Sequence, residues 1–303
     1  MLTAVFGGLG ATVCFTVAAL CASSSSREIG AASTVAWAMV LGLCVIIVPL
    51  ALIGHPSRLS GDTVALLSIA GLSNLVGLHL EYIAYRRVAV GVVTAVASTE
   101  GMVAAILSSI FGTPIATGTI ILLAAITFGV VLTAIHLDPA ETSVDSHPRL
   151  NLRLVVTEMF KRLDRTRSRA TLLVVLVAVL FGITLYAIGR AGTQAPVIWV
   201  LLPARLFGTI LMAAPLLCRR RLRISRRAFP LVFGAGAAEV VGLVSYTFGA
   251  RQQLAVAAVL ASQGAAITPF AAFFLFGERL RRNQIVGVAV VLTGVVLLSV
   301  LGS

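Results

Sequence analysis

Long apolar runs, separated by short turns or basic segments, constrain the fold of this chain more than any other feature. A membrane core about 30 Å thick requires roughly 20 apolar residues in each helix that crosses it. Runs of that length predict ten membrane helices, over residues 2–21, 31–53, 64–86, 91–111, 117–136, 171–190, 196–217, 229–250, 254–276 and 284–301. The sequence therefore predicts an all-α integral membrane protein.

The composition also indicates a membrane protein. Apolar residues make up 59% of the 303 residues, charged residues make up 11%, and the mean hydropathy is +1.05. A soluble domain carries roughly a quarter charged residues. The first apolar run lacks the basic start and cleavage site of a secretory signal, so we interpret it as a membrane helix. We find no soluble enzyme motif and no metal-binding cysteine spacing, and we expect neither enzymatic activity nor a cofactor or metal.

The basic residues, which give a net charge of +12, fall in the loops on one side of the membrane. With ten spans, all but four of the 23 Lys and Arg residues lie in loops that follow odd-numbered spans. Arg58, Arg190 and Arg251 lie on the other side, and Arg205 lies inside a span. Because basic loops remain in the cytoplasm, both termini are predicted outside a cell membrane. This loop pattern argues against nucleic-acid binding.

The two halves of the chain resemble each other. Tyr82, Arg87, Ala97, Ser98 and Gly129–Leu132 recur in the same order as Tyr246, Arg251, Ala261, Ser262 and Gly294–Leu297. Five spans in each half place the halves in opposite orientations, as in many secondary transporters. The predicted units are a five-helix repeat over 1–136, a basic cytoplasmic connector over 137–170 and a second five-helix repeat over 171–303. The connector is either an amphipathic helix on anionic lipid or a solvated linker.

Five polar side chains are predicted at similar depth in five different spans. They are Asn74, Glu100, Arg205, Glu239 and Gln263. A charged side chain at mid-membrane costs about 2.5–3.5 kcal/mol on insertion scales, so such residues are functional candidates. The sequence therefore predicts a shared polar cavity. The alternative is a buried ion pair with interhelical hydrogen bonds that serve only assembly.

Each of these residues has an expected role in such a cavity. Arg205 would bind an anionic group of the substrate, and Asn74 and Gln263 would orient that substrate. One arginine neutralises one glutamate, so either Glu100 or Glu239 remains as a candidate proton carrier or cation ligand. The sequence leaves open which of the two pairs with Arg205.

Two further patterns bear on packing and on the membrane interface. Glu81 lies near Arg86 and Arg87 in the sequence, which predicts a local ion pair, with a gate as the alternative. Small residues recur every fourth position in 97–105 and 257–265. That spacing predicts close approach of two helices, and lipid-facing alanine is the alternative.

The end of the chain resembles a known transporter signature. Phe276–Leu280, Gln284–Val288 and Leu292–Leu297 resemble the closing signature of EamA-type transporters of the drug/metabolite transporter superfamily. Gly277 and Glu278 match the Gly-Glu pair of that signature. The stretch from Tyr82 to Gly112 resembles the same unit in the first half. There Thr113 follows the glycine where the family often has glutamate.

The resemblance implies ten spans in two repeats and a small-molecule substrate. We therefore expect a secondary transporter that exports small metabolites, amino acids or drug-like compounds by alternating access, with membrane lipid and protons as its other candidate partners. Two alternatives remain, a lipid-handling protein such as a carrier-lipid flippase, and a membrane interaction protein without transport activity. The substrate, the coupling ion and the oligomeric state do not follow from the sequence.

Overall fold

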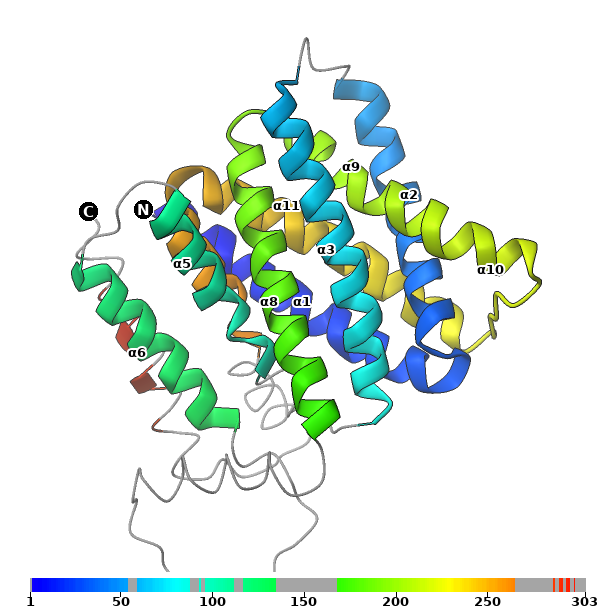
Figure 1. Ribbon diagram of the computed structural model, residues 1–303, viewed down its shortest axis with the longest axis horizontal. Helices are drawn as coiled ribbons and strands as arrows, with labels where there is room; N and C mark the ends of the chain where they lie inside the picture. Colours follow the sequence, from blue (N-terminus) through cyan, green and yellow to red (C-terminus); the bar gives the residue numbers. More distant parts are fainter. Residues whose placement is uncertain are drawn as a thin grey trace, which may run out of the picture.

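Every regular element in the described part of the chain is a helix (Figure 1). The computed structural model describes residues 2–53, 59–87, 93, 96–111, 117–134, 168–264, 286, 289–290, 293–294 and 297. The elements are α1 (Leu2–Ile29), α2 (Ala31–Ile53), α3 (Gly61–Tyr85), α5 (Glu100–Phe111), α6 (Thr117–Ala134), α8 (Ser168–Gly192), α9 (Val197–Phe207), the π-helical η1 (Gly208–Ala213), α10 (Ala214–Cys218) and α11 (Ala228–Ala261).

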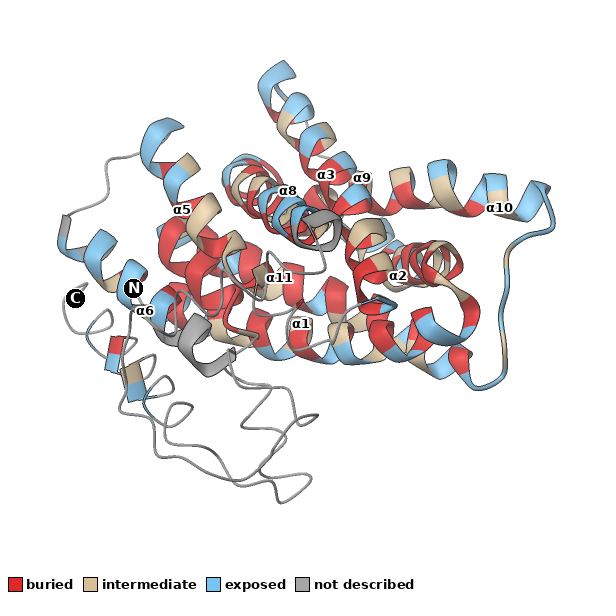
Figure 2. Ribbon diagram, turned by 60° about the horizontal axis from the view of Figure 1, so that its bottom comes forward, coloured by how far each residue is buried: buried red, intermediate tan, exposed pale blue. Residues whose placement is uncertain are grey.

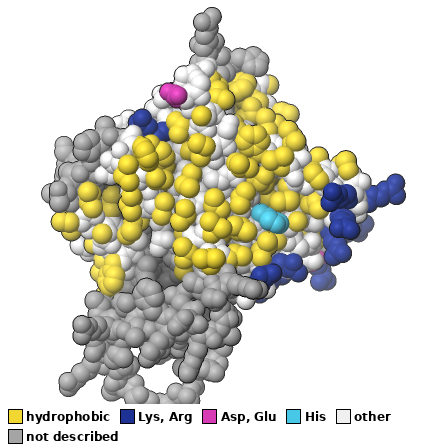
Figure 3. Space-filling model, viewed as in Figure 1, with side chains coloured by type: hydrophobic (Ala, Val, Ile, Leu, Met, Phe, Trp, Pro, Cys, Tyr) yellow, Lys and Arg dark blue, Asp and Glu magenta, His cyan; other side chains and the backbone are white. Residues whose placement is uncertain are grey.

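The described helices are long and apolar enough for a multi-pass membrane protein. Six stretches meet the length and hydropathy of a membrane span, namely Leu2–Ile29, Ala31–Leu52, Gly61–Tyr85, Leu172–Gly192, Val197–Cys218 and Ala228–Ala261. Their outer faces carry large exposed hydrophobic side chains, which cover most of the face drawn in Figure 3. The predicted membrane class is thereby confirmed. The count of ten spans stays a prediction, because most of 137–170, most of 265–303 and the motif residues Gly277 and Glu278 lie outside the described residues.

α11 contains two helical arms that fold back on each other. They join at Gln253, whose φ of −148° and ψ of 96° are extended and not helical. A Cβ on Gly249 would lie 3.3 Å from the Cβ of Ala257, although eight residues of straight helix rise about 12 Å. The Arg251 side chain donates to the carbonyls of Gly192 and Ala195, which ties the turn to the end of α8. The predicted spans 229–250 and 254–276 therefore meet at this kink.

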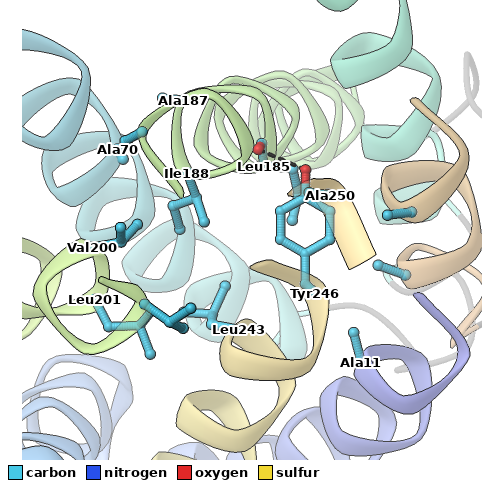
Figure 4. Packing of buried hydrophobic residues seen from close by; sticks show 14 of the residues in the cluster. Ala11, Ala70, Leu185, Ala187, Ile188, Val200, Leu201, Leu243, Tyr246 and Ala250 are labelled. Atoms are coloured by element: carbon cyan, nitrogen blue, oxygen red, sulfur yellow. Dashed lines mark hydrogen bonds between the residues drawn. The ribbon is translucent and has the colours of Figure 1, made fainter. Parts of the chain in front are cut away.

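The core lies where α1, α3, α8 and α11 meet. Buried residues gather on the facing sides of these helices (Figure 2). In the close-up, Leu185, Ile188, Leu243 and Tyr246 pack together, and the Tyr246 hydroxyl donates to the Leu185 carbonyl at 2.7 Å (Figure 4). Glycine lets α1 approach α11 closely, since a Cβ on Gly7 would lie 2.7 Å from the backbone of α11. These four helices form the framework of the site.

The helix predicted over 91–111 is interrupted. Ser98 and Thr99 form a turn, and α5 begins only at Glu100. The Thr99 hydroxyl donates to the Val96 carbonyl at 2.7 Å, and the Thr99 carbonyl accepts the amide of Val103. Glu100 therefore lies at the start of a helix, and the expectation that it sits near the middle of a continuous span is wrong.

A second interruption occurs at the repeat-equivalent place. α11 ends at Ala261, and Ser262 and Gln263 form a turn. Ala261 and Ser262 are the sequence counterparts of Ala97 and Ser98. The two breaks lie against each other, because a Cβ on Gly101 would lie 2.4 Å from the Ser262 Oγ. The predicted close approach of these two small-residue segments is confirmed, although the residues that meet Gly101 are Ala258, Val259 and Ser262 and not the predicted stripe of Ala257 and Ala261.

Candidate functional site

A cavity of about 110 Å³ lies at the centre of the described helices. It is large enough for several water molecules. Its polar and aromatic lining comes from α1, α3, α8, α11 and the two helix breaks, and comprises Phe15, Thr16, Asn74, Glu81, Tyr82, Tyr85, Ser98, Glu100, Phe181, Thr184, Glu239 and Ser262. Discontinuous helices around a polar cavity are the usual setting of a transporter site.

Three carboxylates line this cavity: Glu81, Glu100 and Glu239. None of the other lining residues that the structure describes is a lysine or an arginine. Within the described ranges, no group of three His, Cys, Asp or Glu residues could hold a metal ion. The acidic character of the cavity therefore depends on which of the three acids has a cationic partner elsewhere.

Glu239 is the acid that pairs with arginine. The Arg205 Nη1 lies 2.9 Å from the Glu239 Oε2, and the Asn74 Nδ2 donates to the Glu239 Oε1 at 3.0 Å. Both oxygens of this carboxylate are therefore engaged. The structure thus places Arg205, Asn74 and Glu239 together and answers the pairing that the sequence left open.

Arg205 lies behind Glu239 and is not among the residues that line the cavity. Its side chain is fully buried, and its Nε and Nη2 have no hydrogen-bond partner among the described residues. The guanidinium packs between α9 and α2, where Met39 Sδ lies 3.4 Å from Nη1 and a Cβ on Gly42 would lie 3.2 Å from Cδ and Nε. The sequence provides this space through Gly42. A buried guanidinium in this position compensates the charge of Glu239.

Glu81 faces the cavity and does not form the ion pair that was predicted. Its Oε1 accepts a hydrogen bond from the Tyr85 hydroxyl at 2.7 Å, and the residue is buried. Arg86 and Arg87 are exposed and form no ion pair with it. The prediction was wrong because it rested on the short distance in sequence and not on the face of α3 from which Glu81 projects. The reason is geometric: Glu81, seven residues after Asn74, lies on the same face of α3, whereas Arg86 and Arg87 lie past its end.

Glu100 faces the same cavity from the first turn of α5. Its carboxyl group lines the cavity together with that of Glu81. The rings of Tyr82 and Tyr85 stack beside them, with centroids 6.1 Å apart and planes 24° apart. The described part of the chain holds one ion pair, that of Arg205 with Glu239, so Glu81 and Glu100 face the cavity without a cation from that part.

Gln263 is buried at the second break but is not among the cavity-lining residues. Its Nε2 donates to the Val259 carbonyl at 2.5 Å, and its Oε1 has no hydrogen-bond partner. Of the five side chains singled out in the sequence, the cavity thus gathers Asn74, Glu100 and Glu239. The third acid of the cavity, Glu81, was predicted at the membrane interface. Its spacing of seven residues from Asn74 indicates, however, that both lie on one face of α3.

Comparisons with known proteins agree with this architecture. A crystal structure of another protein has the same fold with a TM-score of 0.72 and 15% sequence identity, and the match covers 99% of this chain and 98% of that one. No curated protein has a significant sequence match to the chain. The sequence profile of the EamA-like transporter family matches residues 2–135 and again residues 168–300. This chain therefore belongs to the EamA-like transporter family.

Proposed function

We propose that this protein is a secondary transporter that exports a small amphiphilic cation in exchange for protons. The observation that carries the proposal is the pair of carboxylates, Glu81 and Glu100, that face one cavity while the buried Arg205 is engaged by Glu239. Two neighbouring acids without a compensating cation form a site for a proton or a positively charged group.

The remaining lining residues favour a cation with an apolar body. The stacked rings of Tyr82 and Tyr85, together with Phe181, supply aromatic surface beside the acids. Aromatic faces attract ammonium groups as well as apolar groups. Such a site suits amines and drug-like cations within the wider range of metabolites, amino acids and drug-like compounds.

The other four predicted site residues support the cavity more than they bind the substrate. Arg205 is occupied by Glu239, which leaves the binding of a substrate carboxylate with less support than the binding of a cation. Asn74 fixes Glu239 and still borders the cavity. Gln263 stabilises the second helix break through Val259. Glu239 remains a weaker candidate for proton coupling than Glu100.

The paired breaks support alternating access. The cavity, about 110 Å³, is smaller than the roughly 300–1,000 Å³ of drug-sized sites, so a larger solute requires the helices to separate. Breaks in the two repeat-equivalent helices, where Gly101 meets Ser262, supply points at which the halves can rock. We infer that the two five-helix repeats exchange conformations around this crossing.

Proton flux in proteoliposomes tests the proposal. Phenyltrimethylammonium is a permanent cation that cannot cross the bilayer as a free base. Added outside vesicles with a trapped pH dye, it should raise the internal pH as protons leave in exchange. Benzyl alcohol and benzenesulfonate, a neutral and an anionic analogue, should have no effect.

The variants assign the flux to the two acids. Glu100→Gln and Glu81→Gln should each lower the rate at least about tenfold, since the exchanged proton loses its site. Asp62→Asn removes an exposed acid from the start of α3 and should transport like wild type. Undiminished flux in the Glu81→Gln/Glu100→Gln double variant would exclude the proposed site. Translocation of labelled lipid without cation flux would favour the lipid-handling alternative.

A further inference from the structure

A second cavity, of about 660 Å³, opens at the end of the molecule where the α1–α2 turn, α3 and α10 meet. Four arginines contribute to its lining: Arg86 from α3, and Arg220, Arg221 and Arg223 from the segment after α10. Its floor is apolar, with contributions from Ile29, Ile83 and Leu216. None of its described lining residues is acidic, so this cavity has a strongly positive potential.

The backbone that carries two of these arginines has a defined conformation. α10 ends in a Schellman motif, in which the Arg220 amide donates to the Leu217 carbonyl at 2.9 Å and the Arg221 amide to the Leu216 carbonyl at 2.8 Å. Arg220 has a φ of 53°, the left-handed conformation for which this position normally carries glycine. From this unfavourable conformation of an arginine we infer that its side chain has a use of its own.

The rest of the segment is fastened to the beginning of α2. The Arg223 amide donates to the Ser33 Oγ at 3.2 Å, and the Trp37 Nε1 donates to the Arg223 carbonyl at 3.0 Å. Ser225 donates to Glu28 at 2.5 Å, which engages a nearby acid away from the cavity lining. The three arginines therefore start from a fixed backbone and converge on one opening.

The chemistry of this cavity suits a phosphate group attached to an apolar molecule. Guanidinium groups bind phosphate oxygens through paired, charge-assisted hydrogen bonds. The cavity also contains His79, whose buried Nδ1 has no hydrogen-bond partner. Basic residues gather at the α10 end of the molecule, directly beside the apolar surface (Figure 3), where Leu217 is 65% exposed.

We propose that this cavity binds the phosphate headgroup of an anionic phospholipid. Soluble phosphate esters share the headgroup's chemistry, but the apolar floor and the adjoining apolar helix surfaces favour a ligand with acyl chains. The headgroup would join Arg86, in the first half of the chain, to the arginines after α10, in the second half. Its binding would therefore restrain movement between the halves at this end, independently of the cation that the central cavity transports.

Tryptophan fluorescence provides a local test. The chain contains two tryptophans, and Trp37 contacts the arginine segment, so in the Trp199→Phe variant the fluorescence comes from Trp37, beside this cavity. The full-length variant in detergent would be titrated with dibrominated phosphatidylglycerol and, separately, with dibrominated phosphatidylcholine. We expect the anionic lipid to quench Trp37 at a concentration at least fivefold lower than the zwitterionic lipid.

Two matched double variants distinguish a specific lipid site from a general attraction between basic residues and anionic lipid. Arg220→Gln/Arg221→Gln should abolish the preference for the anionic lipid, whereas Arg226→Gln/Arg227→Gln, exposed arginines of the same segment outside the cavity lining, should keep it. Equal effects of the two pairs, or equal quenching by both lipids, would overturn the proposal. So would displacement of the lipid by inorganic phosphate at micromolar concentration, which would identify a soluble ligand. If Trp199→Phe does not fold, the same comparison is made on the wild-type chain by native mass spectrometry of retained lipids.

Discussion

Arg205 and Glu239 depend on each other for their burial. Removing the guanidinium leaves a carboxylate buried without compensation, which costs about 3–5 kcal/mol for pairs of this kind. Arg205→Met should therefore lower the free energy of unfolding by about that amount. Chemical denaturation of the purified protein in detergent measures the change.

The matching double variant provides the control. Arg205→Met/Glu239→Leu removes both charges, and replacing a buried pair by apolar residues is often neutral or better. We expect this double variant to recover most, but not all, of the free energy of unfolding that Arg205→Met loses, because Asn74 then lacks its acceptor. A double variant no more stable than Arg205→Met would show that the loss of stability does not come from leaving Glu239 buried without a partner.

At the residue level the sequence predicted a shared polar cavity and three of its lining residues, but not which of the predicted side chains turn away from it. Asn74, Glu100, Arg205 and Glu239 were identified from the free-energy cost of placing such side chains in the membrane. That cost depends on residue type and depth. It could not show that Arg205 turns away from the cavity lining, because the direction of a side chain depends on the packing of its helix against others. Glu81 was misassigned for the same reason.

Among the elements, the crossing of the two broken helices is the most sensitive contact. A Cβ at Gly101 would lie 2.4 Å from the Ser262 Oγ and 2.6 Å from the Ala258 carbonyl oxygen. Overpacking of that kind costs about 1–3 kcal/mol. Gly101→Ala should lower the thermal stability in detergent and slow cation flux several-fold.

Gly118→Ala is the matched control for this contact. Gly118 lies in α6, and a Cβ there would meet nothing within 4 Å. Because alanine also favours the helix, this variant should be as stable as wild type or slightly more stable. Equal losses in both variants would mean that the crossing of the breaks has no special role.

The breaks themselves could not be predicted from hydropathy. The apolar run continues through Ser98 and Thr99 and through Ser262 and Gln263, so its length predicted two continuous helices. Hydroxyl and amide side chains bond to preceding carbonyls at both breaks, but Thr184 and Thr247 do the same inside continuous helix, so these bonds alone do not account for the breaks. The small-residue spacing, by contrast, predicted correctly that these two segments approach each other.

The whole molecule is predicted to lie in the membrane with its basic loops in the cytoplasm. Cys218 is exposed at the end of α10 beside those arginines, and Thr193 is exposed at the end of α8, on the opposite side of the predicted topology. With the other cysteines replaced by alanine, we expect a membrane-impermeant maleimide to label Cys218 only in inverted vesicles. Thr193→Cys, with Cys218 also replaced, should be labelled only in intact cells.

The reverse labelling pattern would contradict the predicted orientation, and labelling of both positions from one side would contradict the single crossing predicted between them, over residues 196–217. The membrane class, by contrast, followed from composition and run length alone, because those properties describe the whole chain and do not depend on packing. The repeat was visible because equivalent positions, such as Ala97 with Ala261, have retained the same residue.

Competition between protons and a cation for the central acids is the claim on which the proposed mechanism rests. The most direct measurement is the Kd of phenyltrimethylammonium for the purified protein as a function of pH, by calorimetry in detergent. We expect the Kd to rise as the pH falls, approaching tenfold per pH unit with one proton released per cation bound. The Glu81→Gln/Glu100→Gln variant should lose this dependence. A Kd that is constant with pH, or unchanged in that variant, would contradict the mechanism.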